Sequence, residues 1–336
     1  FCGFAYYMKL AYTKWSVKPD ITVKITDKLS KEFPMPAVTI CSMTFSRADQ
    51  VDLRTIREKT FYNATQSECE HLYANLNWCA QSTIFKYVFE FCKEHFSHLE
   101  ELNILDVVNR SAYLNEELFS KAISNQFTRV MTYLGVCFTY NMQDQTAIFN
   151  ENIHDDFQCY NNKEHPEIEW NVERGYFNKN STYPEKASKK ALEFATMMNP
   201  LEAKNPCISK AILLIFHLPN EMPNKFNKNF LLSYGSQTQI KITTKSHRTN
   251  DNLRSYSPDI RKCYFDGERK LEFFKSYSVS HCLAECESNI MLKACGCVVF
   301  WMPRNKTTRI CRLSDTKCFN KREAVMQEED RLACHC

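Results

Sequence analysis

Apolar residues in the second quarter of the chain recur with a helical period. Ile84, Val88 and Cys92 follow one another at every fourth position, and residues 116–134 show a similar repeat. Side chains three or four positions apart lie on one face of a helix, so this spacing predicts amphipathic helices. We therefore expect a mainly helical region over residues 67–134.

Strand-like runs stand before and after that region. Residues 23–41 read as extended, because two prolines near their end keep them out of a helix. Residues 136–140 and 211–218 are short apolar runs, and residues 239–244 alternate with period two. Strands at both ends of the sequence with helices between them predict an α+β fold, in which a central β-sheet carries helical insertions.

The last quarter of the chain is dense in cysteine, and the spacing suggests two of the pairs. Cys282 and Cys286 stand four residues apart in a stretch without Gly or Pro, so on a helix they share one face about 6 Å apart. Cys334 and Cys336 are separated by one residue, so in a strand they also share a face, at about twice the ~3.3 Å rise. A helix lying antiparallel to a strand predicts the disulfides Cys282–Cys336 and Cys286–Cys334.

Zinc is the alternative for these sulfurs. The Cys-x-Cys pairs at 295/297 and 334/336 are tighter than the spacing usual in zinc knuckles. Seventeen cysteines in 336 residues are about twice ordinary usage, and this favours an oxidising, extracellular compartment. Asparagine glycosylation motifs point the same way and predict glycans at Asn63, Asn109, Asn180 and Asn305.

Composition also narrows the function classes. The formal net charge is +4, and basic residues are interleaved with acidic ones, so we expect no nucleic-acid partner. Six glycines, none close to another, exclude a phosphate-binding loop, and no run of eighteen apolar residues occurs. The chain therefore carries no complete membrane span and no motif for a nucleotide cofactor.

A possible metal or nucleophile site is the segment with Cys92, His95 and His98. A disulfide cysteine on the apolar face of a helix, beside two exposed histidines, is the favoured interpretation. Because most cysteines are expected to be oxidised, no reactive thiolate stands out. We predict no enzyme activity, and no catalytic, metal-binding or cofactor-binding residue.

The first residues form an apolar, aromatic stub. Residues 1–13 are followed by Lys14 and Trp15, and Tyr12 stands near the boundary. One interpretation is a buried first strand or helix. The other is the outer end of a truncated transmembrane helix, with Tyr and Trp at the membrane interface.

Four blocks of the sequence resemble the epithelial sodium channel/degenerin family, most closely its insect pickpocket branch. The cysteine-rich segment 277–336, with its Cys-Gly-Cys-Val-Val-Phe-Trp-Met-Pro run, is similar to the family's thumb, and residues 261–277 resemble the strand leading into it. Near the start, Phe-Pro-Met-Pro-Ala-Val-Thr-Ile-Cys at 33–41 resembles the element after the first membrane helix. Gly-Val-Cys-Phe-Thr-Tyr-Asn at 135–141 resembles another family strand. These blocks cover nearly the whole chain in the family's order.

The resemblance implies a disulfide pattern and a domain layout. It implies a sheet of the palm and β-ball type with a helical finger (67–134) and a stapled thumb (277–336), within an extracellular domain over 14–336. Cys263 and Cys2 are left as free thiols, and the pairing of Cys69, Cys79, Cys92, Cys159 and Cys207 stays open. The implied pairs are Cys41–Cys137, Cys282–Cys336, Cys286–Cys334, Cys295–Cys318 and Cys297–Cys311.

The function that the resemblance implies is the extracellular gating region of a sodium channel subunit in the plasma membrane. Such channels are homo- or heterotrimers that conduct sodium ions, and each subunit anchors itself by two membrane helices. The pore helix is absent from this sequence, and Tyr12 and Trp15 would lie at the wrist where the ectodomain meets the first helix. The alternative is a secreted or membrane-tethered cysteine-rich binding module without a pore.

Overall fold

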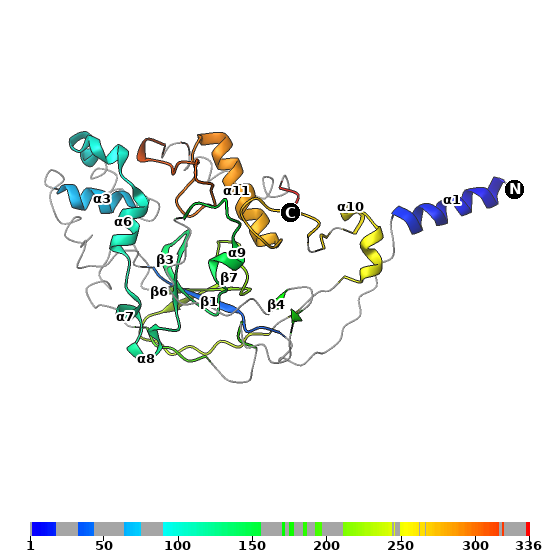
Figure 1. Ribbon diagram of the computed structural model, residues 1–336, viewed down its shortest axis with the longest axis horizontal. Helices are drawn as coiled ribbons and strands as arrows, with labels where there is room; N and C mark the ends of the chain where they lie inside the picture. The colour runs from blue at the N-terminus through cyan, green and yellow to red at the C-terminus, as the bar shows by residue number, and fades with distance from the viewer. Residues whose placement is uncertain are drawn as a thin grey trace.

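The computed structural model contains a five-stranded antiparallel β-sheet with helices on both sides of it, α6 (Ile104–Ser111) and α11 (Val279–Cys295) on one side and α7 (Asn115–Leu118) and α8 (Lys121–Ser124) on the other (Figure 1). This arrangement confirms a mixed fold with a central sheet. The structure describes residues 2–17, 33–43, 64–74, 90–155, 170–171, 175–177, 184–186, 192–196, 211–243, 245, 249–261, 263–265, 267–315, 318 and 334–336.

The strands of the sheet lie in the order β2-β3-β1-β6-β7, and each neighbouring pair is antiparallel. The runs predicted at 136–140 and 211–218 form β3 and β6, and the end of the run at 23–41 forms β1. The strands are β1 (Ala37–Ser42), β2 (Thr128–Thr132), β3 (Gly135–Tyr140), β6 (Ala211–His217) and β7 (Lys228–Ser233), and β4 (Trp170–Asn171) and β5 (Gly175–Tyr176) form a separate pair.

Both faces of the sheet are covered, so the central strand β1 is buried along its whole length. Ala37 and Cys41 pack on one face with Ile215, and Val38 and Ile40 pack on the other. The alternation follows from the two-residue period of a strand. The first face is covered by residues that include Phe149, Phe273, Phe274 and Ala284, and the second by Leu118, Phe119 and Phe127.

The prediction of a helix over 116–134 is wrong for the second half of that range. Two short helices, α7 (Asn115–Leu118) and α8 (Lys121–Ser124), are followed by strand β2, which pairs with β3 in a tight hairpin. The two-residue turn ends at Gly135, whose φ of +83° disfavours any residue with a side chain. Pairing with a neighbouring strand has overridden the helical spacing, as tertiary context often does.

The period-two stretch at 239–244 is also not a strand in the part that is described. Residues 239–243 are irregular and mostly exposed. The fifth strand of the sheet is instead β7, which lies at the edge beside β6. Alternation alone does not reveal whether a neighbouring strand is present. A strand at the edge of a sheet, such as β7, pairs with one neighbour.

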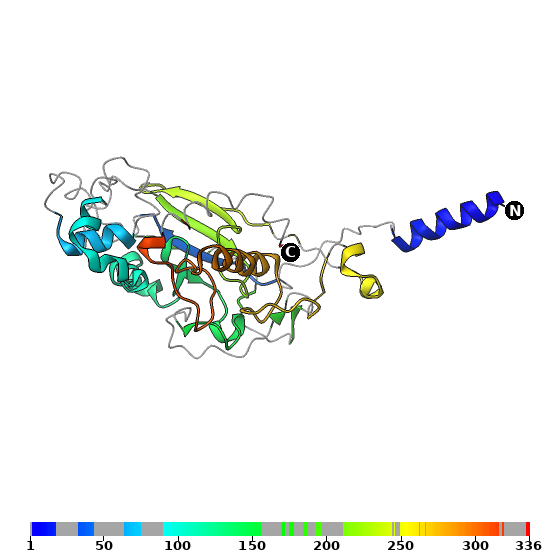
Figure 2. The same ribbon diagram turned by 90° about the horizontal axis from the view of Figure 1, so that it is seen from above.

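The longest helix of the folded body, α11 (Val279–Cys295), crosses above β1 in Figure 2 and shares its core with α6 (Ile104–Ser111). Asn103 caps α6 by accepting a hydrogen bond from the Leu105 backbone N–H at 3.1 Å. The other helices are α1 (Cys2–Val17), α3 (Gln66–Ala74), α9 (Gln145–Ile148) and α10 (Pro258–Arg261), with 3₁₀ turns at Ser97–Glu101, Asp251–Ser255 and Leu313–Asp315.

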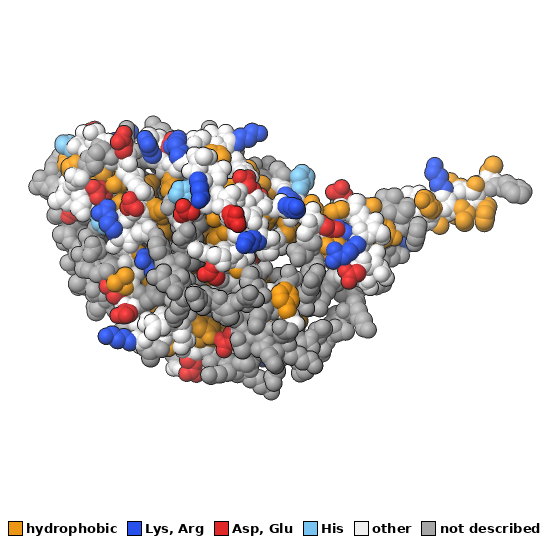
Figure 3. Space-filling view, viewed as in Figure 1, with side chains coloured by type: hydrophobic (Ala, Val, Ile, Leu, Met, Phe, Trp, Pro, Cys, Tyr) orange, Lys and Arg blue, Asp and Glu red, His pale blue; other side chains and the backbone are white. Residues whose placement is uncertain are grey.

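Helix α1 projects away from the body in both views (Figures 1 and 2). Its side chains are exposed wherever they are described, so the stub is not a buried first element of the core. No helix in the described part of the chain has the length and apolar character to cross a bilayer. Figure 3 shows apolar side chains along α1, and acidic and basic side chains interleaved over the visible face of the body.

Candidate functional site

Helix α11 begins and ends at residues that the sequence marks clearly. Ser278 is its N-cap, and the Ser278 side chain accepts a hydrogen bond from the His281 backbone N–H at 3.1 Å. Gly296 ends the helix in the left-handed conformation, with φ of +67°, and donates its N–H to the Leu292 carbonyl. Between these caps no Gly or Pro interrupts seventeen residues of helix. The segment is therefore a regular rod.

Two disulfides join this rod to the end of the chain. Cys282–Cys336 and Cys286–Cys334 have Cα–Cα distances of 5.8 and 5.9 Å, and these are the pairs that the helix spacing predicts. The expected strand at 334–336 is wrong, because these residues form a turn in which His335 has a φ of +51°. The turn still presents both sulfurs to one side of α11, and the staples need no more than that.

Polar contacts fix the stapled end in place. The Arg269 guanidinium donates to the Cys334 carbonyl at 3.0 Å and to the His335 carbonyl. The Tyr277 hydroxyl donates to the Cys336 carbonyl at 2.7 Å. The Arg269 group also lies over the rings of Tyr264 and Tyr277, 5.3 and 5.9 Å from their centroids. The segment before α11 thus holds the tail to the helix independently of the sulfurs.

Two further disulfides follow α11. Cys295–Cys318 and Cys297–Cys311 are the pairs implied by the family resemblance. Between them the loop packs Val298 and Phe300 into the core that α6 and α11 share. The rod, its staples and this loop form one body, which we call the stapled module (residues 279–315, 318 and 334–336).

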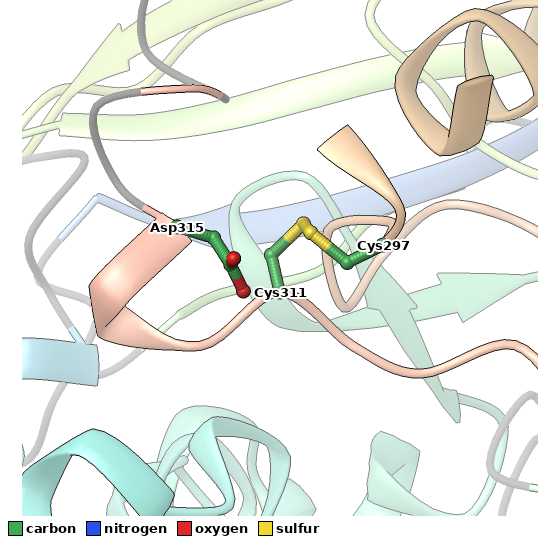
Figure 4. Close-up of side chains that lie close together, drawn as sticks. All are labelled: Cys297, Cys311 and Asp315. Carbon is green, nitrogen blue, oxygen red and sulfur yellow. A yellow bond between two sulfur atoms is a disulfide. The ribbon is translucent and has the colours of Figure 1, made fainter. Parts of the chain in front are cut away.

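The one cluster of described side chains with metal-ligand spacing lies in this module. Cys297, Cys311 and Asp315 have ligand atoms within 4.8 Å of one another. Figure 4 shows the two sulfurs joined in a disulfide, so neither is a thiolate that binds a metal. The Arg309 guanidinium donates to Asp315 at 2.6 Å and lowers the pKa of its carboxyl. The arrangement is a disulfide beside an ion pair.

The first turn of α11 is seated on the sheet through His281, which is fully buried. Its ring stacks on Phe274 with the centroids 4.0 Å apart. The Met222 backbone N–H donates to Nε2 at 3.2 Å, and Nδ1 lies 3.1 Å from the Ser276 carbonyl. Because a carbonyl only accepts, Nδ1 carries the proton and the ring is neutral. Burial lowers the pKa of His281 to about 4.

A second buried histidine continues this polar chain into the sheet. His217, at the end of β6, has Nδ1 2.9 Å from the Leu218 carbonyl and Nε2 2.8 Å from the Thr39 hydroxyl. Thr39 Oγ1 lies in turn 3.0 Å from the Thr139 hydroxyl. Burial lowers the pKa of His217 to about 4, and burial raises the pKa of the neighbouring Glu221 carboxyl. These contacts link β3, β1 and the end of β6, and the loop that follows β6 reaches the base of α11 through the hydrogen bond from Met222 to His281.

The first turn of α11 is also held by the loop after β6, which sequence reasoning did not find. We call the contacts of this turn with Phe274, Met222 and that loop the seat of α11. The Asn224 side-chain amide donates to the Ser280 hydroxyl at 2.6 Å. Lys225 and Glu287 form an ion pair at 2.9 Å in which both side chains are mostly shielded. We call residues 218–227 the clasp. Its only signal in the sequence is a cluster of Asn and Pro, which is typical of any turn.

The other predicted cysteines fall into three groups. Cys41–Cys137 joins β1 to β3, as the resemblance implies, and Cys2 and Cys263 are free thiols. Cys69–Cys92 is a disulfide that the sequence left open. Since Cys92 is oxidised and His95 stacks on Phe91, the segment is not a thiolate metal site. The remaining cysteines, Cys79, Cys159 and Cys207, lie outside the described residues.

The fold makes some of the glycosylation motifs more accessible to glycan attachment than others. Asn305 lies in the loop of the stapled module, where its carboxamide oxygen accepts from the Thr307 hydroxyl at 2.9 Å. Asn109 and Asn305 are both half-buried, but Asn109 lies in α6, where Ser111 of its motif is buried and its hydroxyl donates to the Val107 carbonyl, whereas Thr307 is exposed. Asn63 and Asn180 are not among the described residues.

We expect a glycan at Asn305 and none at Asn109 in the folded, secreted protein. A glycan on Asn109 would have to displace packed neighbours, whereas Asn305 lies in a polar loop. After expression in a secretory host, Asn305→Gln should remove one glycosidase-sensitive increment of mass, and Asn109→Gln should remove none. An unchanged mass for Asn305→Gln contradicts the prediction. The mass of Asn63→Gln, at a motif outside the described residues, is measured alongside so that the sizes of the mass losses can be compared.

The wrist candidates lie on α1. Tyr12 is 67% exposed, and Trp15 belongs to the same helix although its side chain is not described. The structure does not bring Tyr12 together with the stapled module.

Comparison with known proteins gives a consistent set of relatives. The profile of the family described as amiloride-sensitive sodium channel matches residues 1–336. Pickpocket protein 28 of Drosophila melanogaster is 23% identical over 98% of this chain and 54% of its own length. The bile acid-sensitive ion channel of Homo sapiens is 26% identical over 89% of this chain and 51% of its own length. The chain spans about half the length of these relatives.

Proposed function

The chain belongs to the amiloride-sensitive sodium channel family, and on that premise we propose that it is the extracellular gating region of a sodium channel subunit in the plasma membrane. The family match over the whole chain is the observation that carries this proposal. The density of disulfides supports an extracellular location, because such bonds persist in oxidising compartments. A secreted module without a pore is less favoured, since the matching family is described as a sodium channel and one of the two named relatives is an ion channel.

We assign the parts of the fold by the same reasoning. The stapled module corresponds to the thumb of residues 277–336, and α3 and α6 belong to the finger of residues 67–134. The five-stranded sheet is part of the palm and β-ball. Residues 1–13 are the outer end of the first membrane helix, and the subunit assembles with others of its family into a homo- or heterotrimer that conducts sodium.

The mechanism that we propose treats the stapled module as a rigid lever. Three disulfides hold α11 to its loop and tail and a fourth closes the loop itself, so a force on the module moves it as one body. The base of α11 is tied to the sheet through His281 and the clasp, which gives the lever a fixed pivot. In the assembled channel, contact between this body and Tyr12 or Trp15 would transfer its displacement to the first membrane helix.

The full-length subunit should produce an amiloride-sensitive sodium current in oocytes, alone or with a co-expressed family subunit. Within that channel, Trp15→Ala should uncouple the stimulus from the current by at least tenfold while surface biotinylation stays near the parent level. Tyr7→Ala, on the same exposed helix, is the matched control and should leave the stimulated current unchanged.

One outcome would contradict the proposed function, and another would contradict only the proposed route of coupling. A subunit that reaches the surface but gives no sodium current, alone or with family subunits, supports the module without a pore. A normal stimulated current in Trp15→Ala rejects the coupling role and leaves Trp15 as an anchor at the lipid interface. The first outcome concerns the function and the second only the route of coupling.

A further inference from the structure

A cavity of about 330 Å³ lies beside α11, between the helix and the segment that precedes it. Leu271 and Ile290 supply apolar surface, and the staple cysteines Cys282, Cys286 and Cys334 line the same space. Pockets for small molecules start at about 300 Å³ and combine an apolar wall with a few polar groups. The cavity has both the size and this mixture. Its position between two elements means that an occupant would contact both.

The charged groups around the cavity are unequal in number. Among the described residues that line it, Arg269, Lys270 and Lys293 stand against one carboxylate, that of Glu285. The Glu285 carboxylate accepts a hydrogen bond from the Phe273 backbone N–H at 3.0 Å, which engages part of its acceptor capacity.

The cations remain able to attract an anion. Arg269 donates to two backbone carbonyls, which are neutral, so its charge is not cancelled by these contacts. Lys270 and Lys293 are exposed, so their ammonium groups are accessible to a ligand. Cationic groups at the mouth of an apolar site favour a ligand with a negative head and an apolar body.

We propose that this cavity binds a small amphipathic anion, a carboxylate or sulfonate carried on a compact apolar body. The anionic group lies between Lys270 and Lys293, and the apolar body covers Leu271 and Ile290. The ligand bridges α11 and the segment leading to Phe273 and Phe274, which form part of the seat of the helix. This inference does not require the chain to be a channel subunit, so its test is independent of the current measurements.

The test uses 1-anilinonaphthalene-8-sulfonate, whose fluorescence rises in apolar sites, titrated into the 336-residue chain at fixed salt. We expect one saturable component that weakens at least tenfold in the double variant Lys270→Glu/Lys293→Glu. Lys228→Glu, an exposed lysine on β7 outside the cavity, is the matched control and should leave it unchanged. Signal from the exposed apolar side chains of α1 is common to all three proteins and cancels in the comparison.

A second variant tests the apolar wall without changing charge. Ile290→Trp fills the cavity and should also weaken the saturable component at least tenfold, with peptide mapping showing that the staples are intact. The uncharged analogue N-phenyl-1-naphthylamine should bind at least tenfold more weakly than the sulfonate to the parent chain, and sulfate alone should not displace the probe. Equal binding of the two probes overturns the requirement for an anion. Unchanged affinity in both the double lysine variant and Ile290→Trp overturns the site itself.

Discussion

Removing both staples of α11 should lower the free energy of unfolding by about 6.5 kcal/mol, whereas removing either one alone should lower it by only about 2.5 kcal/mol. The sequence separations of the two pairs are 54 and 48 residues. Closing a loop of that size in the unfolded chain is worth about 4 kcal/mol in the entropic account. Once one staple exists, the second closes a ring of only about eight residues, which is worth about 2.5 kcal/mol.

The measurement is urea unfolding of three variants in which each pair is replaced as a unit, so that no unpaired thiol is created. The variants are Cys282→Ala/Cys336→Ala, Cys286→Ala/Cys334→Ala and the combination of both. The combined loss should exceed the sum of the single losses by about 1.5 kcal/mol, because each single variant keeps the long loop closed. Strictly additive losses, or a combined loss below about 3 kcal/mol, contradict the loop argument.

The staples could be predicted because their geometry is local at both ends. Cys282 and Cys286 share a helix face whatever the rest of the fold does, and this spacing selects a partner pair that is similarly close. The prediction of a strand at 334–336 failed because Cys334 and Cys336 also face one way in a turn. One residue between two cysteines therefore fixes their distance but not the backbone between them.

The strands show where periodicity is informative. Residues 211–218 were correctly predicted because a strand buried on both faces gives a continuous apolar run. Strand β7 was missed because most of its side chains are exposed at the edge of the sheet, so it carries no burial pattern. The stretch at 239–244 shows the alternating pattern but forms no strand in its described part. The expected helix over 116–134 failed in its second half because pairing with β3 overrode the helical spacing.

The seat of α11 could not be predicted because its parts are distant in sequence. Thr39 and His217 are separated by 178 residues, and Met222 and His281 by 59. A buried polar group has to be satisfied wherever the fold places it, and sequence spacing gives no measure of such distances. The two histidines were therefore unremarkable in the sequence, although they connect the sheet to the module.

Acidification from pH 7 to pH 4 should weaken the fold through His217 and His281. Burial holds the pKa of each at about 4 in the folded chain, against an ordinary value of 6.5. As the pH falls below 6.5 the unfolded chain takes up two protons that the folded chain does not, so stability declines until the pH passes the folded pKa. Each histidine contributes up to about 3 kcal/mol to this loss.

Glu221 acts in the opposite direction. Burial raises the pKa of its carboxyl, so its contribution to stability is present at low pH and is lost as the pH rises through that raised pKa. Acidification therefore restores part of what the histidines remove. The pH dependence of the parent chain therefore combines the loss through the two histidines with the opposing contribution of Glu221.

The prediction is tested by urea unfolding at several pH values between 7 and 4. His281→Gln retains a neutral polar side chain and should reduce the loss of stability over that range by up to about 3 kcal/mol. Glu221→Gln should steepen the decline, since the opposing group is gone. A pH profile that is identical in the parent and in His281→Gln would show that this histidine does not titrate on unfolding, and would leave the acid sensitivity of the fold to other groups.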